Sequence, residues 1–589
     1  MRVADYIIQR IVEQNVRNLF MVTGRGVLYL SDAAAKCEKL NCVSVHHEQG
    51  GAYAAMAYAQ YNENLGACLV STGCASTNAI TPVLCAWQDE VPMIVISGQN
   101  TLKETTRHTG ICIRTYGQQE ADIVSIVSSI TKYAVMIENP SCIAYELDKA
   151  FYLAKTGRKG PVWIDVPLDV QNMRIDPEDL ERFVVDKKIV DLPDISDIYT
   201  SLQKAKRPVV MIGGGVRSAG AVDAFKAFVN AWKLPVVYAN SAVDVFGTEN
   251  ALSLGVVSSM AANRAANFAI QNADYVLVLG CRLTSMTVGG DRAKFARKAK
   301  IDIVDIDKKE HQKGTVAYHS LICADVKDFL NEVNKCPSSE VSFEWQEKCC
   351  HWKKLFPKCP VERKGKTPMD LYEVANALSA YLADDAIVVC DAGLEELIIP
   401  STVSFREKQR CLHPVCQGAM GYALPAVIGA YLSSGKESVA VTGDGSVMMN
   451  IQELQTLAYH RYPVKILIIN NDCYAVIRKR QQDLFRTRTV GTDEANGVSC
   501  PNFAKVAMAF EIKYEKIKNF LELSKLKTVL NAEEPVICEI MTTANQTFLH
   551  SSFARTNTGK FVQRPLEDQS PFLDRKTFLE EMVVEPIDQ

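Results

Sequence analysis

The sequence predicts an α/β protein with three doubly wound parallel-sheet domains. Its 589 residues are too many for a single hydrophobic core. Short apolar runs rich in β-branched residues recur along the chain, as in buried parallel strands, and turns of small residues followed by helical stretches come after them. We expect domains at residues 1–172, 195–335 and 366–545, with a polar tail or lid at 546–589.

The composition favours a small-molecule enzyme over a nucleic-acid or membrane protein. Hydrophobic residues make up 48% of the chain and charged residues 23%, which is typical of a globular protein. A net charge of −3 gives no general attraction for nucleic acid or anionic membranes. The N-terminus lacks the pattern of a secretion signal, and no run reaches the roughly 18 apolar residues of a membrane span. We expect a cytoplasmic protein.

Most of the 19 cysteines stand singly in apolar runs, as small core residues do. One cluster, Cys336, Cys349, Cys350, His351 and Cys359, has residue types that bind zinc. It lacks paired C-x-x-C spacing, and two adjacent cysteines are a poor start for a tetrahedral site. A zinc site is therefore the less favoured interpretation, and a disulfide framework is not expected.

The first domain carries one acidic residue in an unusual place. Glu48 ends a mostly apolar strand and opens a helix of alanine and glycine that can pack closely, so its carboxylate would be partly desolvated. The ordinary alternative is an acidic residue favoured there by the helix dipole. Two further turns, at Gly24 and from Ser71 to Asn78, follow apolar strands and can face a ligand.

The second domain offers weaker signals. The run Val209–Ile212 is followed by the glycine turn Gly213–Gly215, and two more strands are expected at Tyr275–Leu279 and Ile301–Asp307. A lone Gly-Gly-Gly turn is weak evidence for a nucleotide site.

The third domain holds the most informative stretch. Gly443-Asp444-Gly445-Ser446 follows the apolar run Ser438–Val441, and Asn470-Asn471 closes the next run at Val464–Ile469, with a crossover helix expected from Met448 to His460. These polar residues therefore sit at strand carboxyl ends, where open α/β sheets bind ligands. Glycines let the backbone approach phosphate, and Asp and Asn oxygens are ligands that Mg²⁺ accepts. Taken alone, Gly-Asp-Gly could equally be an ordinary turn.

With Asn470-Asn471 at this spacing, the Gly443 to Ser446 turn resembles the signature of thiamine diphosphate (ThDP) enzymes. The resemblance implies that Asp444, Asn471 and the carbonyl of Cys473 hold Mg²⁺ on the diphosphate. It also implies that Glu48 hydrogen-bonds the aminopyrimidine and acts as a base through the cofactor, and that Met420 wedges between the two rings. The other cofactor-binding positions that it implies are Gly24, Gly73, Asn78, Gly393, Gly418, Gly443, Gly445, Ser446 and Tyr474.

Within this family the chain is similar to acetolactate synthase large subunits over roughly residues 1 to 540. Matches at Gln119-Glu120-Ala121-Asp122 and Ile130-Thr131-Lys132 carry over Gln119 and Lys132 as catalytic positions. The resemblance makes the first domain pyrimidine-binding, the third diphosphate-binding, and the central one a possible FAD site, which stays open. It further implies a homodimer or tetramer with active sites between subunits, and decarboxylation of a 2-oxo acid, such as pyruvate, with transfer of its acyl carbanion to a carbonyl acceptor.

The departures from the family cluster where the acceptor is expected. The family's Arg-Phe-Asp-Asp-Arg stretch ends in an arginine that pairs with the acceptor carboxylate, whereas Arg282 to Met286 ends in methionine. Arg480 replaces a pocket tryptophan, Gln118 replaces a phenylalanine, and Glu395 falls within the family's Gly-Gln-His-Gln. We therefore expect Gln118, Met286, Glu395 and Arg480 to line a pocket for a larger acceptor, such as a keto-sugar or its nucleotide-linked form.

Three alternatives remain from the sequence. The chain could be a true acetolactate synthase catalytic subunit, if the alignment of these variable stretches slips. It could be a ThDP lyase or hydrolase that protonates or hydrolyses the intermediate. It could also be a non-catalytic ThDP-fold subunit, against which the presence of Glu48, Asp444 and Asn471 argues.

Overall fold

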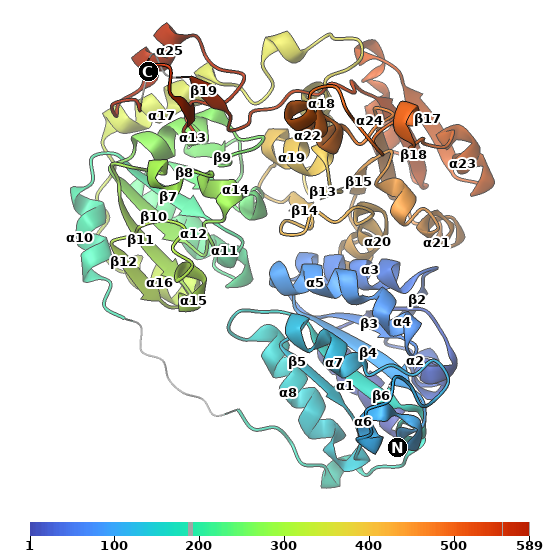
Figure 1. The fold of residues 1–589 in the computed structure, drawn as a ribbon. Helices are drawn as coiled ribbons and strands as arrows, with labels where there is room; N and C mark the ends of the chain where they lie inside the picture. The colour runs from blue at the N-terminus through green and yellow to red at the C-terminus, as the bar shows by residue number, and fades with distance from the viewer. Residues whose placement is uncertain (186–192, 556–557, 588–589) are drawn as a thin grey trace.

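The computed structural model describes residues 1–185, 193–555 and 558–587, and it contains three six-stranded parallel sheets in three successive units (Figure 1). The predicted fold class is therefore confirmed. All strands of these sheets fall within the three predicted domain ranges, whose limits stay predictions. Part of the predicted linker before the second unit, and four residues of the predicted tail, lie outside the described residues.

The first unit has the strand order β2-β1-β3-β4-β6-β5, and all neighbouring strands are parallel. Its four interior strands β1, β3, β4 and β6 are buried along their whole length because helices cover both faces of the sheet, which explains their largely apolar sequence. The strands are β1 (Asn18–Met21), β2 (Asn41–Ser44), β3 (Gly66–Val70), β4 (Met93–Gln99), β5 (Tyr133–Met136) and β6 (Val162–Pro167). The helices are α1 (Val3–Glu13), α2 (Leu28–Lys36), α3 (Glu48–Asn62), α4 (Cys74–Asn78), α5 (Ile80–Gln88), α6 (Thr106–Thr109), α7 (Ile123–Val127), α8 (Ile143–Lys155) and α9 (Leu168–Asn172).

The central unit has a different order, β12-β11-β10-β7-β8-β9, in which β7 and β10 lie side by side at the middle of the sheet. Its strands are β7 (Pro208–Ile212), β8 (Val236–Tyr238), β9 (Ser253–Val256), β10 (Tyr275–Leu279), β11 (Lys300–Asp305) and β12 (Ser320–Cys323). Its helices are α10 (Ser196–Lys204), α11 (Gly215–Ser218), α12 (Val222–Trp232), α13 (Arg264–Asn272), α14 (Ser285–Val288), α15 (Lys308–His311), α16 (Val326–Val333) and α17 (Phe343–Leu355).

The third unit repeats the topology of the first, with the order β14-β13-β15-β16-β18-β17. Its strands are β13 (Ile387–Cys390), β14 (Arg410–Leu412), β15 (Ser438–Gly443), β16 (Lys465–Asn470), β17 (Lys513–Ile517) and β18 (Val536–Met541). Its helices are α18 (Leu371–Tyr381), α19 (Leu394–Thr402), α20 (Ala423–Ser434), α21 (Glu453–His460), α22 (Ala475–Phe485), α23 (Phe503–Ala509) and α24 (Lys525–Leu530).

The crossover helix between β15 and β16 is shorter than the sequence suggests. A short 3₁₀ turn at Val447–Met449 comes first, and α21 begins only at Glu453. The helical conformation is interrupted at Asn450, whose φ of −136° is not helical. The side-chain Nδ2 of Asn450 donates to the carbonyl of Gly421 at 2.8 Å. The predicted start at Met448 is wrong because this side-chain bond competes with the helix.

The first and third units pack against each other through α3 and α20, which Figure 1 shows side by side at the centre of the molecule. Both helices are rich in small residues, so their backbones approach closely. A Cβ at Gly429 would lie only 1.9 Å from the carbonyl oxygen of Ala54. One hydrophobic core cluster therefore runs through both units.

The tail packs on the central unit of the same chain. It contains the antiparallel hairpin β19 (Phe553–Arg555) and β20 (Phe561–Gln563), and the helix α25 (Arg575–Glu581). The buried carboxylate of Glu567 accepts from Gln271 of α13 at 2.6 Å and pairs with Arg297 at 2.7 Å. Glu581 of α25 binds His351, a member of the cysteine-rich cluster, at 2.8 Å.

Two kinds of feature are absent from the described residues. They contain no group of three or more His, Cys, Asp or Glu side chains arranged for a metal ion. They also contain no helix with both the length and the apolar character that crossing a membrane requires.

Candidate functional site

Glu48 is the first residue of α3 and lies half-buried just beyond the carboxyl end of β2. Its Oε2 accepts a hydrogen bond from Nδ2 of Asn78 at 2.9 Å. Asn78 ends α4, which follows the turn after β3, so two strands that flank β1 bring the pair together. An amide that donates to the carboxylate fixes its orientation and leaves its second oxygen available.

Two glycine turns surround this pair. Gly73 has a φ of +63°, and a Cβ there would lie 1.9 Å from the carbonyl oxygen of Gln119, so only glycine fits. A Cβ at Gly24 would lie 2.5 Å from Oγ of Ser71. The turns after β1 and β3 are thus packed tightly against each other. We call Gly24, Glu48, Gly73, Asn78 and Gln119 the Glu48 group.

Asp444 lies in the turn after β15, is 2% exposed, and ties this turn to the end of β16. Its Oδ2 accepts the N–H groups of Asn471 at 3.0 Å and Asp472 at 2.7 Å, and its Oδ1 accepts that of Gly445 at 2.7 Å. Burial raises the pKa of Asp444 to about 6, although the three N–H groups oppose this shift. The carboxylate is therefore fixed beside the Asn471 side chain, whose Oδ1 accepts from the Cys473 N–H at 3.2 Å.

Glycines stand at several positions in the turns near this carboxylate. Gly393 and Gly418 have φ values of +102° and +52°, which other residues rarely adopt. A Cβ at Gly445 would lie 1.9 Å from the Tyr474 ring. The side chain of Met420 is half-buried. We call the following the Asp444 group: Gly393, Gly418, Met420, Gly443, Asp444, Gly445, Ser446, Asn471, Cys473 and Tyr474.

Two neighbouring glutamates at the start of α19 have different surroundings. Glu395 is 3% exposed, and its carboxylate oxygens lie 3.0 Å from the Cβ position of Gly393 and 3.4 Å from that of Gly443. Burial, with Asp444 and Asp391 nearby, raises the pKa of Glu395 well above its usual value. Glu396 faces His413 at 3.5 Å, and although burial lowers the pKa of His413, Glu396 outweighs this and raises it to about 9. A cation therefore compensates Glu396 but not Glu395.

The two groups have no direct bond within one chain. No hydrogen bond or ion pair in the described part of the chain joins Glu48 or Asn78 to Asp444 or Asn471. Their indirect links include the α3–α20 packing and Asn450, whose Nδ2 also donates to Gln49 Oε1 at 3.1 Å.

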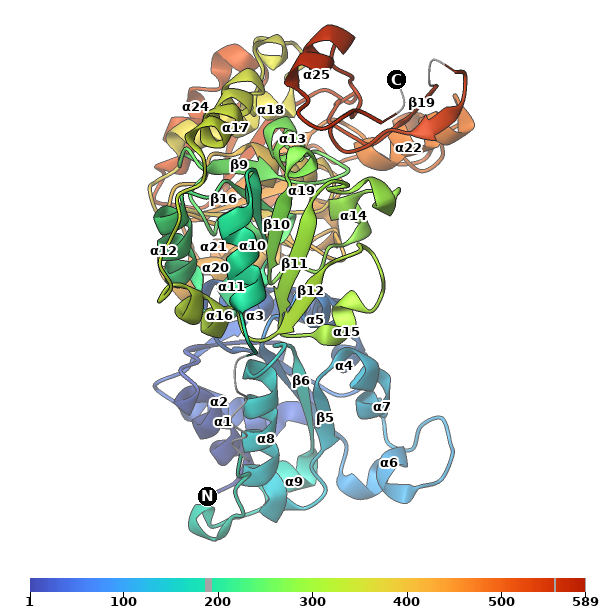
Figure 2. The same cartoon turned by 90° about the vertical axis from the view of Figure 1, so that its left-hand side faces the viewer.

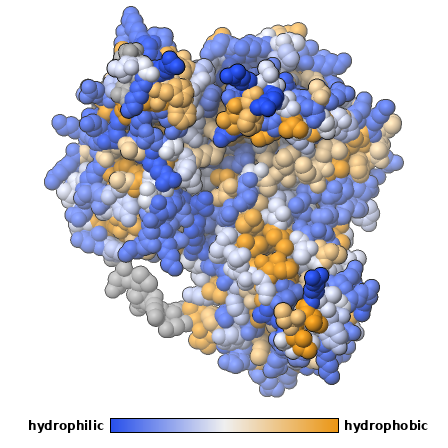
Figure 3. All heavy atoms as spheres, in the orientation of Figure 1, coloured by the Kyte–Doolittle hydropathy of each residue, from blue (hydrophilic) through white to orange (hydrophobic). Residues whose placement is uncertain are grey.

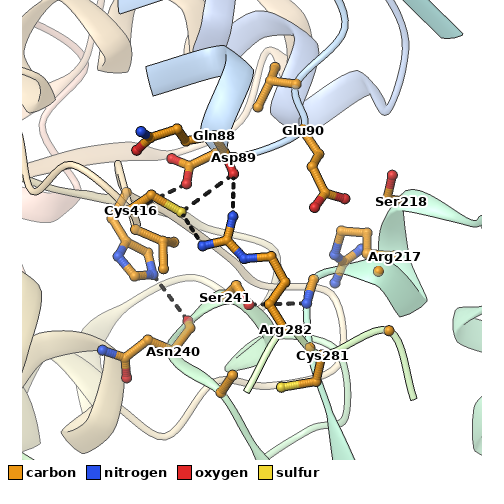
Figure 4. A pocket seen from close by; sticks show the side chains of 18 of the residues that line it. Gln88, Asp89, Glu90, Arg217, Ser218, Asn240, Ser241, Cys281, Arg282 and Cys416 are labelled. Atoms are coloured by element: carbon orange, nitrogen blue, oxygen red, sulfur yellow. Dashed lines mark hydrogen bonds between the residues drawn. The ribbon is translucent and has the colours of Figure 1, made fainter. Parts of the chain in front are cut away.

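A cavity of about 450 Å³ lies where the three units meet (Figure 4). Its walls come from the end of α5, the turns after β7, β8 and β10, and the segment after β14. Arg282 crosses it, donating to the carbonyl of Gln88 at 2.8 Å and to Sγ of Cys416 at 3.1 Å. Oδ1 of Asp89 accepts from the Cys416 N–H at 3.1 Å, and burial raises the pKa of Asp89 to about 6.

Comparison with known proteins identifies the family of this chain. Residues 1–126 match the N-terminal TPP binding domain of thiamine pyrophosphate enzymes, residues 195–333 match their central domain, and residues 391–540 match their C-terminal TPP binding domain. The acetolactate synthase large subunit of Lactococcus lactis is 30% identical over 97% of this chain and 98% of its own length.

The chain is a thiamine pyrophosphate enzyme. The acetolactate synthase large subunit of Corynebacterium glutamicum is 33% identical over 86% of this chain and 80% of its own length. The large subunit of acetolactate synthase isozyme 1 from Escherichia coli is 29% identical over 92% of this chain and 94% of its own length. The protein is thus an acetolactate synthase-like enzyme that forms C–C bonds with ThDP.

The Asp444 group suits the diphosphate end of ThDP. Glycines stand at three strand ends, after β13, after β14 and at the end of β15, and a glycine backbone can approach phosphate oxygens closely. The carboxylate of Asp444, the amide oxygen of Asn471 and the carbonyl of Cys473 form an all-oxygen donor set of the kind that Mg²⁺ accepts. The residues present therefore fit both the cofactor and the metal that the sequence predicts for it.

The central cavity fits FAD poorly. A dinucleotide diphosphate needs free N–H donors, but those of the glycine turn are used inside the protein: Gly213 donates to Leu279 O, Gly214 to Ser241 Oγ and Gly215 to Gly280 O. Gly213 and Gly215 are glycines for a packing reason, because a Cβ at either would lie under 3.0 Å from the Gly280–Cys281 backbone. The lining cations Arg217 and Arg410 are both paired with Asp244.

The four predicted acceptor residues lie in separate places within one chain. Met286 lines the central cavity, whereas Glu395 lies beside the glycines of the Asp444 group. Gln118 is exposed and accepts from Arg25 at 2.7 Å, and Arg480 is exposed on α22. A single chain therefore does not assemble them into one pocket.

The two predicted catalytic positions also lie apart. Gln119 is exposed beside Gly73. Lys132 donates to the Thr156 carbonyl at 2.7 Å, and burial lowers its pKa to about 8. Sequence reasoning missed Asn450 and the pair Glu396–His413. Asn450 follows the Gly443 to Ser446 motif closely, but nothing in the sequence shows that it reaches Gln49.

Proposed function

We propose that this enzyme decarboxylates a 2-oxo acid, most simply pyruvate, and joins the remaining acyl unit to the carbonyl of a polyhydroxylated acceptor such as a keto-sugar. Met286 is the observation that carries the choice of acceptor. It lines the central cavity at a position where the resemblance to acetolactate synthases expects an arginine for an acceptor carboxylate. A thioether cannot form that ion pair.

The surroundings of Met286 support an acceptor without a carboxylate. The cavity's arginines already bind protein groups, since Arg217 and Arg410 pair with Asp244 and Arg282 binds Gln88 and Cys416. The polar side chains of Asn240 and Ser241 also line the cavity. Such walls can exchange hydrogen bonds with hydroxyl groups without needing a new charge pair.

ThDP supplies, when bound, the carbon nucleophile and the electron sink for decarboxylation. In our proposal Glu48 exchanges a proton with the aminopyrimidine nitrogen, and Asn78 orients Glu48. Asp444, Asn471 and the carbonyl of Cys473 hold Mg²⁺, and Met420 provides an apolar surface for the rings. The reaction is redox-neutral, so it needs no flavin chemistry, and we assign none to the central cavity.

We propose that two copies of the chain complete each site. The Glu48 and Asp444 groups have no direct bond within one chain, and exposed hydrophobic residues lie near both. Figure 2 shows α6 projecting from the first unit, with Ile111, Ile113 and Tyr116 exposed in the loop after it. Figure 3 shows hydrophobic side chains gathered over α22 and on the first unit, with a recess between them. A homodimer or tetramer would cover this face.

The test is product analysis with purified protein, ThDP, Mg²⁺ and ¹³C-labelled pyruvate, with and without keto-sugars. The proposal expects label in a branched sugar and little acetolactate from pyruvate alone. Acetolactate formation from pyruvate alone at an ordinary enzyme rate, near ~10 s⁻¹, would overturn it. Labelled acetaldehyde or acetate as the main product would instead identify a lyase or hydrolase, and no turnover with any acceptor a non-catalytic subunit.

A true acetolactate synthase catalytic subunit is the second candidate. Its support is the similarity to acetolactate synthase large subunits over nearly the full length of both chains. The same experiment separates the two, because this candidate makes acetolactate from pyruvate alone. If the protein is a true acetolactate synthase, Met286→Arg should have little effect on its choice of acceptor. In our proposal, Met286→Arg should instead favour a second 2-oxo acid over a keto-sugar as the acceptor.

A further inference from the structure

Glu453 is a fully buried carboxylate at the junction of the first and third units. It is the first residue of α21, and no ion pair to it exists among the described residues. Its Oε1 accepts the backbone N–H of His46, from the other unit, at 3.1 Å. Its Oε2 accepts a hydrogen bond from the Oγ1 hydroxyl of Thr456 at 2.7 Å. Among the described residues, the Glu453 carboxylate therefore accepts hydrogen bonds only from neutral groups.

The contacts of Glu453 lie on both sides of Glu48. His46 is two residues before Glu48, and Gly50 is two residues after it. A Cβ at Gly50 would lie 2.6 Å from Oε1 of Glu453, so the carboxylate occupies the space that a side chain would need. Asn450 adds a bond to Gln49 at 3.1 Å. The third unit thus contacts the segment from residue 46 to residue 50 at three places: the backbone N–H of His46, the side chain of Gln49 and the close approach at Gly50.

We propose that Glu453 is a positioning residue that sets the place of the Glu48 carboxylate. The inference rests on the proposed role of Glu48. Glu48 opens α3, so the direction of its side chain follows the backbone path into that helix, and Glu453 fixes that path from outside. Displacement of a proton-transfer group by about 1 Å can cost on the order of 100-fold in rate.

The two contacts require a side chain of this length. Glutamine at 453 can keep both, because its oxygen can accept from the His46 N–H and its NH₂ group can donate to the Thr456 hydroxyl, which also accepts. Aspartate would be one methylene shorter and leave the His46 N–H without its partner. Either change leaves α21 itself intact, because Glu453 is a terminal residue of that helix.

The first experiment needs no cofactor. Amide hydrogen exchange of the full chain without ThDP should become at least tenfold faster in the segment from 45 to 51 when Glu453→Asp is introduced, because the His46 N–H loses its partner. The segment from 438 to 443 in β15 should be unchanged. Gln455→Ala, on the exposed side of α21, is the matched control and should change neither segment. Unchanged exchange at 45–51 would overturn the proposal.

The second experiment measures exchange of the thiazolium C2 proton and the affinity for ThDP with Mg²⁺. Glu453→Asp should slow C2 exchange at least tenfold while the ThDP Kd changes less than threefold. A parallel loss of affinity, C2 exchange and thermal stability would show a merely structural role and overturn the inference. If Glu48→Gln itself leaves C2 exchange unchanged, the proposed function fails instead.

A compensating pair keeps the test independent of folding failure. Gly50→Ala should slow C2 exchange because its Cβ would push against the Glu453 carboxylate. Combining it with Glu453→Asp removes that collision, so the double variant should recover at least part of the rate lost in Gly50→Ala. Simple addition of the two losses would show that the residues are not coupled and would contradict the proposal.

Discussion

The first and third units have the same strand order and both match TPP binding domains, yet in our proposal they bind opposite ends of one cofactor. In each, the helix after the second strand, α3 or α20, packs at the common interface, and the turn after the third strand faces the ligand side. That turn reads Ser71-Thr72-Gly73 in the first unit and Asp444-Gly445-Ser446 in the third. The same sheet topology thus presents different turn residues at equivalent places, and in our proposal these residues decide whether the turn serves the organic ring or the metal diphosphate.

The units also differ at one buried position of the sixth strand. Asp165 of β6 pairs in register with Ser97, and Glu539 of β18 pairs with Ile468. Asp165 is bonded only to neutral groups, Ser97 at 2.6 Å and Gln99 at 3.3 Å. Glu539 has a cation, Lys516, at 3.1 Å. Equivalent positions in two copies of one topology therefore hold their charge in different ways.

The largest effect is expected from removing the acid of the first unit. Glu48→Gln should slow exchange of the thiazolium C2 proton by about 10²–10⁴-fold, because it removes a proton-transfer group. The ThDP Kd should stay within about threefold, since the diphosphate end is bound by the other unit. NMR-detected C2 exchange and calorimetry provide these measurements. Glu38→Gln, at an exposed position, is the control, and full activity in Glu48→Gln would refute the assignment.

Removing the carboxylate of Asp444 in the third unit should mainly weaken cofactor binding, whereas removing that of Glu48 should mainly slow C2 exchange. Asp444→Asn should weaken Mg²⁺-dependent ThDP binding by about 10–100-fold or more, because a charged metal ligand is lost. Saturating ThDP and Mg²⁺ should restore part of the C2 exchange, which they cannot do for Glu48→Gln. Titration calorimetry at several Mg²⁺ concentrations measures this. Asp483→Asn, exposed on α22, should bind normally, and tight binding in Asp444→Asn would count against the site.

A third change tests the interface between the two copies of the topology. Gly429→Ala places a Cβ 1.9 Å from the Ala54 carbonyl, so α3 and α20 must move apart. Overpacking of this kind destabilises by about 1–3 kcal/mol. Thermal unfolding should show a lower Tm for Gly429→Ala and almost none of this shift for Gly247→Ala, where the nearest atom is 3.7 Å away. Equal shifts for both variants would mean that the interface is not tight.

The smallest effect is a pH dependence in the first unit. Burial raises the pKa of Asp165 to about 7 from a usual value near 3.8, so the folded protein binds more protons and its stability falls as pH rises between these values. The Asp165→Asn variant has no carboxyl at this position, so its stability does not fall in this way as the pH rises. The free energy of unfolding of Asp165→Asn relative to the parent should therefore increase from pH 5 to pH 8 by on the order of 1 kcal/mol. Tm measured across this range tests it. Glu539→Gln, which removes a carboxylate paired with Lys516, should show no such gain.

Much of this arrangement could be predicted because it is local in sequence. The Gly443 to Ser446 turn and Asn471 belong to adjacent strands, so strand length and spacing alone place Asp444 against the Asn471 backbone, and the structure has that contact. The contact of Glu453 with His46 could not be found in this way. It joins residues more than 400 positions apart and depends on how α3 and α20 pack. The start of α21 failed for a similar reason, since a side-chain bond from Asn450 to a distant carbonyl decides it.

The tail has a consequence for how the chain is made. Three buried amide side chains on α13 of the central unit, those of Asn267, Gln271 and Asn272, have partners in the tail. Those partners are synthesised about 300 residues later, as the separation between Gln271 and Glu567 shows. Each of these side chains also bonds within the central unit, but its tail partner is made only with the last segment, so the central unit gains its full set of bonds late while the first unit can finish early. In order of completion, the centre of this protein comes last.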